Sequence, residues 1–119
     1  MDVEPARVLE ALMAVVDERR LVVTLVPADG ELNLKALAAA VGGKRADMAE
    51  VRRAERASGY VKDGISPFGQ RRLLPAVVDA AVRGHASVFV NGGRRGLKIE
   101  LAPADLSKAL GATVAAIAA

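Results

Sequence analysis

The chain has 119 residues, a length that fits one domain with a hydrophobic core and is too short for two. It contains no cysteine and one histidine, His85, so disulfides, thiolate nucleophiles and cysteine-ligated metals are excluded, and no metal site or cofactor is expected. The 17 Lys and Arg residues exceed the 14 Asp and Glu residues only slightly, but many of the arginines are bunched, as in Arg52-Arg53, Arg71-Arg72 and Arg94-Arg95, which suits a solvated surface or a phosphate backbone.

The first half of the chain alternates apolar runs with turn residues. Apolar side chains in residues 8–16 fit a helical period, so the pattern alone favours a helix there. A turn at 17–20 and the β-branched run within 21–26 predict a strand. After a turn at 27–30, Asn33 is placed to cap a helix that ends at Gly42 and Gly43.

The second half predicts further short elements. In chain order they are a strand at 46–48, a charged helix at 49–57, strands at 76–78, 87–90 and 97–101, a helix at 104–110 and a last strand at 113–117. The strands at 87–90 and 97–101 form a hairpin, and Pro103 opens the following helix. The prediction is a mixed α/β fold, with residues 1–119 forming one layered domain.

Two glycine-containing segments stand out, Gly64-Ile65-Ser66-Pro67-Phe68-Gly69 and Asn91-Gly92-Gly93-Arg94-Arg95-Gly96-Leu97-Lys98-Ile99-Glu100-Leu101. Glycine allows positive φ and close approach of a ligand to backbone N–H groups. Glycine between two strands also makes an ordinary hairpin turn, and pattern alone favours that interpretation.

The residues of the two segments, with their order and spacing, resemble the motifs of the YbaK-type family of aminoacyl-tRNA editing proteins, which includes the Cys-tRNA(Pro) deacylases. The likeness continues through other short stretches and covers nearly the whole chain from about Val8: Val26-Pro27, residues 32–38, Gly59-Tyr60, Leu74-Pro75 and residues 103–106. The resemblance implies a mixed sheet or barrel flanked by helices, and it implies that residues 8–16 form a strand rather than a helix.

The resemblance also implies a function, the trans-acting deacylation of mischarged tRNA, with Cys-tRNA(Pro) as the expected substrate. No Ser-His-Asp or Cys-His arrangement is present, which is consistent with the family. The resemblance implies that the deacylation is largely substrate-assisted, with backbone N–H groups near Gly64, Gly92 and Gly93 as positioning donors. The implied catalytic residues are Glu10, Gly64, Asn91 and Lys98. The implied substrate-binding residues are Ile65, Ser66, Pro67, Phe68, Gly69, Gly92, Gly93, Arg95 and Gly96. Arg71, Arg72 and Arg94 would contact tRNA phosphates. Ser66 is interpreted as a turn hydroxyl rather than a nucleophile, and Arg95 could equally brace the hairpin.

Three positions depart from the family pattern. Glu10 stands where the family usually has a lysine tied to activity, Asn91 replaces a frequent serine, and Lys98 replaces a usual acid. Because the first and third exchanges reverse both charges, Glu10 and Lys98 could face one another as a pair, or each could simply be a solvent-facing strand residue. These departures leave a second function open, a catalytically impaired module that binds tRNA or a synthetase.

Partners and location follow from the same resemblance. The expected partners are aminoacyl-tRNA and prolyl-tRNA synthetase. No association with a membrane is expected, because no apolar run of the sequence is long enough to span one. The start of the chain lacks the pattern of a secretory signal, so the cytoplasm is expected. Family members usually begin with a further helix and strand that nothing here matches, so a homodimer that covers the missing layer is a further expectation.

Overall fold

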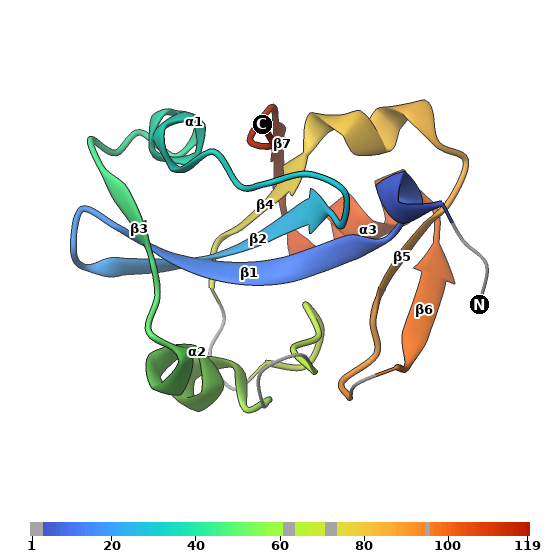
Figure 1. The fold of residues 1–119 in the computed structure, drawn as a ribbon, viewed down its shortest axis with the longest axis horizontal. Coiled ribbons are helices and arrows are strands. Elements are labelled where there is room, and N and C mark those ends of the chain that lie inside the picture. The colour runs from blue at the N-terminus through green and yellow to red at the C-terminus, as the bar shows by residue number, and fades with distance from the viewer. Residues whose placement is uncertain (1–3, 61–63, 71–73, 95) are drawn as a thin grey trace.

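A computed structural model describes residues 4–60, 64–70, 74–94 and 96–119, which form a mixed α/β fold (Figure 1). Within these residues five strands form a mixed sheet in the order β3-β1-β2-β4-β7, and β5 and β6 form a separate antiparallel pair. The strands are β1 Leu9–Val16, β2 Arg20–Pro27, β3 Ala46–Met48, β4 Ala76–Asp79, β5 Val88–Asn91, β6 Lys98–Leu101 and β7 Thr113–Ala115. The helices are α1 Leu34–Ala40, α2 Val51–Ser58 and α3 Pro103–Leu110, with short 3-10 helices η1 Pro5–Arg7 and η2 Ala80–Gly84.

The sheet is covered on both faces (Figure 1). On one face, Ala14 and Val16 of β1 pack with the buried Leu37 of α1. On the other face, Met13 packs against α2, and Leu9 packs with residues of β5 and α3. Strand β1 therefore has apolar side chains on both of its faces, which is why its sequence does not show the alternation of a half-exposed strand. The strand that the family resemblance implies is confirmed, and the helix favoured by pattern alone is wrong.

The turn between β1 and β2 takes a left-handed backbone. Asp17 and Glu18 have φ of 52° and 62°, the geometry of the tight turns that suit antiparallel hairpins. The Asp17 carboxylate accepts hydrogen bonds from the backbone N–H groups of Lys44 and Arg45, at 2.9 and 3.0 Å. These bonds lower the pKa of Asp17 below its usual value and fix the segment that leads into β3 against the hairpin.

The helix ends follow the sequence signals. Asn33 accepts a hydrogen bond from the N–H of Ala36 at 3.0 Å, which confirms it as the N-cap of α1. Gly59 ends α2 with φ of 82°, a left-handed position that glycine adopts without strain. Helix α3 starts at Pro103, as predicted.

The C-terminal segment is held by Asp79, which is 4% exposed at the end of β4. One of its carboxylate oxygens accepts from the N–H groups of Ile117 and Ala118, both at 2.9 Å, and the other accepts from Ala81 at 3.1 Å. The predicted strand at 113–117 therefore stops earlier, at Ala115, because the following N–H groups bond a side chain instead of a neighbouring strand. The two 3-10 helices were not predicted from the sequence.

Candidate functional site

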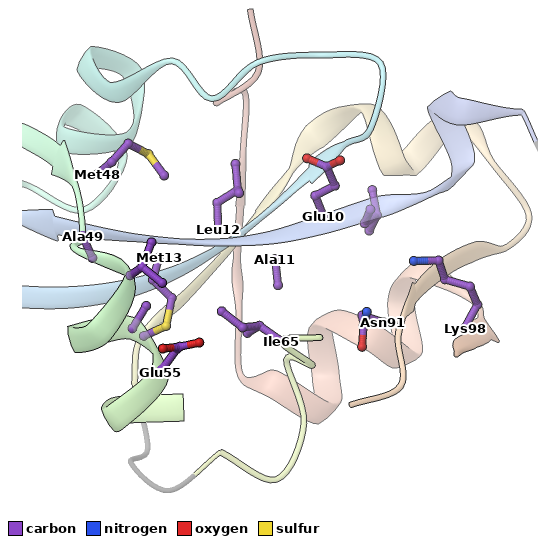
Figure 2. A pocket seen from close by; sticks show the side chains of 13 residues that line it. Glu10, Ala11, Leu12, Met13, Met48, Ala49, Glu55, Ile65, Asn91 and Lys98 are labelled. Atoms are coloured by element: carbon purple, nitrogen blue, oxygen red, sulfur yellow. The ribbon is translucent and has the colours of Figure 1, made fainter. Parts of the chain in front are cut away.

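A pocket of about 320 Å³ opens beside the first half of β1. Its walls come from β1, the end of β3, helix α2, the loop that contains Ile65, and the β5–β6 pair (Figure 2). The lining is mainly apolar. The residues that border it are Leu9, Glu10, Ala11, Leu12, Met13, Met48, Ala49, Val51, Ala54, Glu55, Ile65, Asn91 and Lys98.

The pocket lies at an incompletely paired edge of the sheet. In the described ranges β3 pairs with β1 only at residues 14–16, and β5 meets the start of β1 in a single bridge between Val8 and Phe89. The Met13 carbonyl accepts from the N–H of Ala49 at 3.0 Å, so it points away from β2. Because hydrogen-bonding direction alternates along a strand, the backbone N–H and carbonyl of Ala11 point the same way, into the gap between β3 and β5. The pocket thus combines apolar side chains with a strand edge.

Three of the four predicted catalytic residues line this pocket. Glu10 projects from β1 and is exposed, while Lys98 and the buried Asn91 lie directly opposite one another on β6 and β5. Figure 2 shows Glu10, Asn91 and Lys98 at the same end of the pocket. No ion pair joins Glu10 to Lys98 in the part of the chain that the structure describes. The fourth residue, Gly64, is buried and does not border the pocket.

The first glycine-containing segment contributes one side chain to the lining, that of Ile65. Ser66 is 2% exposed, and its hydroxyl accepts from the N–H of Phe68 at 3.2 Å. Its carbonyl accepts from the side-chain amide of Gln70 at 2.9 Å. Ser66 therefore has the contacts of a turn residue, and Pro67, Phe68 and Gly69 lie outside the pocket lining.

The second segment forms the hairpin between β5 and β6. The N–H of Gly92 donates to the Leu97 carbonyl at 2.8 Å, and the N–H of Gly93 donates to the side-chain oxygen of Asn91 at 2.7 Å. Both N–H groups therefore close the hairpin in this structure, and a substrate would have to compete for them, so their part in positioning substrate stays a prediction. Gly96 has φ of 84°, so this glycine serves the turn itself.

Tyr60, which the sequence analysis did not place in the site, connects the two segments. Its hydroxyl donates to the Phe68 carbonyl at 2.5 Å. A side chain at Gly93 would meet the Tyr60 ring at 3.1 Å, and one at Gly69 would meet its hydroxyl at 3.3 Å. The two segments thus pack on one side chain, Gly93 against the ring and Gly69 against the hydroxyl, and both glycines permit that approach. Two signals were available: Gly59-Tyr60 is one of the stretches that carry the family resemblance, and Tyr60 is the single tyrosine of the chain.

The sequence patterns also did not predict the pocket wall that β3 and α2 form. Met48 and Val51 are large apolar residues that are 49% and 47% exposed, and both border the pocket. Helix α2 carried no motif, so only its packing against β1 reveals its part in the site.

The structure describes only one of the arginines that were predicted to contact phosphate or substrate. Arg94 is exposed at the β5–β6 turn, whereas Arg71, Arg72 and Arg95 lie outside the described residues. Across the described ranges, no three His, Cys, Asp or Glu side chains are grouped to hold a metal ion. None of the helices within those ranges has the length and hydrophobicity needed to cross a bilayer.

Comparison with known proteins decides the family. A model of the aminoacyl-tRNA editing domain matches residues 1–109. The chain belongs to the aminoacyl-tRNA editing domain family. The YbaK-type resemblance drawn from the two glycine-containing segments is therefore confirmed.

One relative of this editing domain is EbsC of Enterococcus faecalis, a candidate Cys-tRNA(Pro)/Cys-tRNA(Cys) deacylase. The two are 33% identical over 103 residues, which cover 87% of this chain and 63% of EbsC. The editing domain described here thus spans less than two thirds of the length of that relative.

Two solved structures share the fold. A candidate trans-editing enzyme for prolyl-tRNA synthetase superimposes with a TM-score of 0.88 and 24% identity, covering 98% of this chain and 73% of its own. A structure from computational grafting of epitope backbones onto scaffold proteins gives a TM-score of 0.90 and 23% identity, covering 98% and 74%. At these identities the likeness establishes the architecture of the editing domain, a mixed sheet flanked by helices.

Proposed function

We propose that this chain hydrolyses the ester bond of mischarged aminoacyl-tRNA in trans, with Cys-tRNA(Pro) as the leading substrate. The observation that carries the proposal is the pocket at the β1 edge, which gathers Glu10, Ile65, Asn91 and Lys98 in a chain of the editing-domain family. The assigned activity of EbsC supports the choice of substrate. This hydrolysis would take place in the cytoplasm, beside prolyl-tRNA synthetase, where mischarged tRNA is formed.

The reaction requires little from protein side chains. Water adds to the ester carbonyl carbon, and the resulting oxyanion collapses to release the amino acid as the ribose oxygen takes up a proton. Among the described residues, those that line the pocket include no serine, threonine or cysteine that could act as a nucleophile, so groups of the substrate would assist the attacking water. The backbone N–H of Ala11, at the open edge of β1, is placed to donate to the carbonyl oxygen as it gains charge.

Recognition of the tRNA end would rest on arginines. Arg94 is exposed on the turn that follows Asn91, and Arg71, Arg72 and Arg95, which lie outside the described residues, stay predicted phosphate contacts. An unpaired acceptor end exposes sugar hydroxyls and base edges to such a surface. Binding through phosphates predicts an affinity that falls steeply as salt rises.

A second function is favoured by one observation, the exchange of charges at Glu10 and Lys98. If the family's activity needs a cation on β1, this chain would hold the tRNA end or a synthetase without hydrolysing the ester. Both residues border the pocket, so the exchange alters the site itself.

The two functions are separated by hydrolysis of a panel of aminoacyl-tRNAs, namely Cys-tRNA(Pro), Ala-tRNA(Pro) and Pro-tRNA(Pro). The unaltered chain is compared with Glu10→Lys and with Glu31→Lys, which makes the same charge change at an exposed residue outside the pocket. Hydrolysis by the unaltered chain supports the editing proposal and names the substrate. Hydrolysis by Glu10→Lys alone supports the binding module, and the absence of hydrolysis in all three proteins overturns the editing proposal.

A further inference from the structure

One end of the pocket carries two opposite charges that come from different strands. Glu10 extends from β1 and Lys98 from β6, and both are exposed. Figure 2 shows the Lys98 ammonium reaching back toward the part of β1 that carries Glu10. Glu10 lies on the face of β1 that also carries Leu12, opposite Ala11, so the two charges border the pocket at the open edge of β1 from different faces of the strand.

These two charges do not neutralise one another in the structure. The ion pairs among the described residues join Arg7 to Glu100 and Arg45 to Asp47, neither of which includes Glu10 or Lys98. Glu100 lies two residues from Lys98 on β6, but its carboxylate accepts from Ser87 at 2.6 Å and from Arg7 at 3.4 Å. Both charges at the pocket end are thus available to a ligand.

The rest of the lining sets the character of that ligand. Between the charged end and helix α2 the walls are apolar, with Ala11, Met13 and Ile65 along them. A fitting ligand has a small apolar group, a cation for Glu10 and an acceptor oxygen for Lys98. An α-amino acid ester has all three, because its ammonium group lies one carbon from its carbonyl.

We propose that Glu10 binds the α-ammonium group of the aminoacyl moiety, so that the site selects amino acid esters with a free, charged amino group. The inference rests on the proposed function, since it assigns a role within the same pocket. Lys98 faces the ester carbonyl from the other side. Esters of hydroxy acids, and aminoacyl groups blocked at nitrogen, are then poor ligands because they leave the Glu10 carboxylate without a cation.

The test is binding rather than hydrolysis, so it does not depend on catalysis. Two stable amides of 3′-amino-3′-deoxyadenosine are compared by calorimetry, one alanyl and one lactoyl, which differ in an ammonium against a hydroxyl of similar size. We expect the alanyl compound to bind the unaltered chain about fivefold more tightly, the effect of one ion pair at an exposed position.

Three variants locate the preference. Glu10→Gln is expected to bind both compounds equally, whereas Glu31→Gln, outside the pocket, keeps the preference. Glu55→Gln removes a different acid from the pocket, at the α2 end that Figure 2 shows opposite Lys98, and also keeps it.

The inference is overturned if the unaltered chain binds the two compounds equally or binds neither. It is also overturned if the preference survives Glu10→Gln or disappears with Glu55→Gln. The editing proposal is decided separately by the hydrolysis panel, so equal binding by a chain that hydrolyses aminoacyl-tRNA would refute only the role of Glu10.

Discussion

Replacing Asp79 tests whether one buried carboxylate holds the C-terminal segment to the sheet. In Asp79→Ala, the buried N–H of Ile117 loses its acceptor, which costs about 2 kcal/mol for a donor that water does not reach. The N–H groups of Ala118 and Ala81 are only partly buried, and together they add roughly 1 to 2 kcal/mol because water replaces part of each bond. The total is a loss of about 3 to 4 kcal/mol in the free energy of unfolding.

Asp79→Asn separates the two oxygens of the side chain. The amide oxygen can keep the bonds to Ile117 and Ala118, but its NH2 group then faces the N–H of Ala81, so about 1 to 2 kcal/mol is lost. In urea unfolding followed by circular dichroism, with a slope of about 1.5 kcal/mol/M, the midpoint falls by roughly 2 M for Ala and 1 M for Asn. Asp29→Asn, at an exposed turn residue, is the control and leaves the midpoint unchanged. Equal losses for Ala and Asn, or losses below about 0.5 kcal/mol for both, would refute the reasoning.

Three further predictions concern the turns and the site. Gly43→Ala places a methyl group against the buried Val16, so we expect the free energy of unfolding in urea to fall by about 1 to 3 kcal/mol. Gly84→Ala has open space around it and should change that free energy by less than about 0.5 kcal/mol. Equal effects of the two substitutions would contradict the packing argument. The lowered pKa of Asp17 adds stability that is full above its unfolded value near 4 and is lost as the pH falls through the lower folded value. Asp17→Asn should therefore make the midpoint less dependent on pH below about 4, and an unchanged profile would rule this out. Tyr60→Phe removes the hydrogen bond to the Phe68 carbonyl and should lower the free energy of unfolding by about 1 kcal/mol, measured by thermal unfolding. An unchanged melting temperature would contradict this prediction.

The sequence predicted most of the helices and strands because residues within or next to each element determine where it begins and ends. Asn33 and the glycines after α1 and α2 define helix ends through their own backbone preferences, and the structure has those ends. Strand β1 is different, because both of its faces are buried and its apolar residues then imitate a helical period. Only the family resemblance separated the two interpretations, since periodicity carries no information about how many layers cover a strand.

The site could be predicted only where a motif marked it. Ile65, Asn91 and Lys98 lie in or beside recognisable segments, and they border the pocket together with Glu10. The α2 wall has no such mark, because its place in the site depends on packing against a strand almost forty residues earlier in the chain. The motif also did not indicate that the N–H groups of Gly92 and Gly93 donate within the hairpin, where those hydrogen bonds compete with bonds to a ligand.

The position of Tyr60 gives this chain an optical reporter of its own. The sequence contains no tryptophan and one tyrosine, so ultraviolet-excited emission from the folded protein comes almost entirely from this side chain. The ring lies against Gly93 and its hydroxyl binds the Phe68 carbonyl, so any change in the distance between the two loops alters both the contacts and the hydrogen bond of the emitting group. Ligand-dependent rearrangement of the loops can therefore be followed in the unmodified protein, without a label and at a single known position.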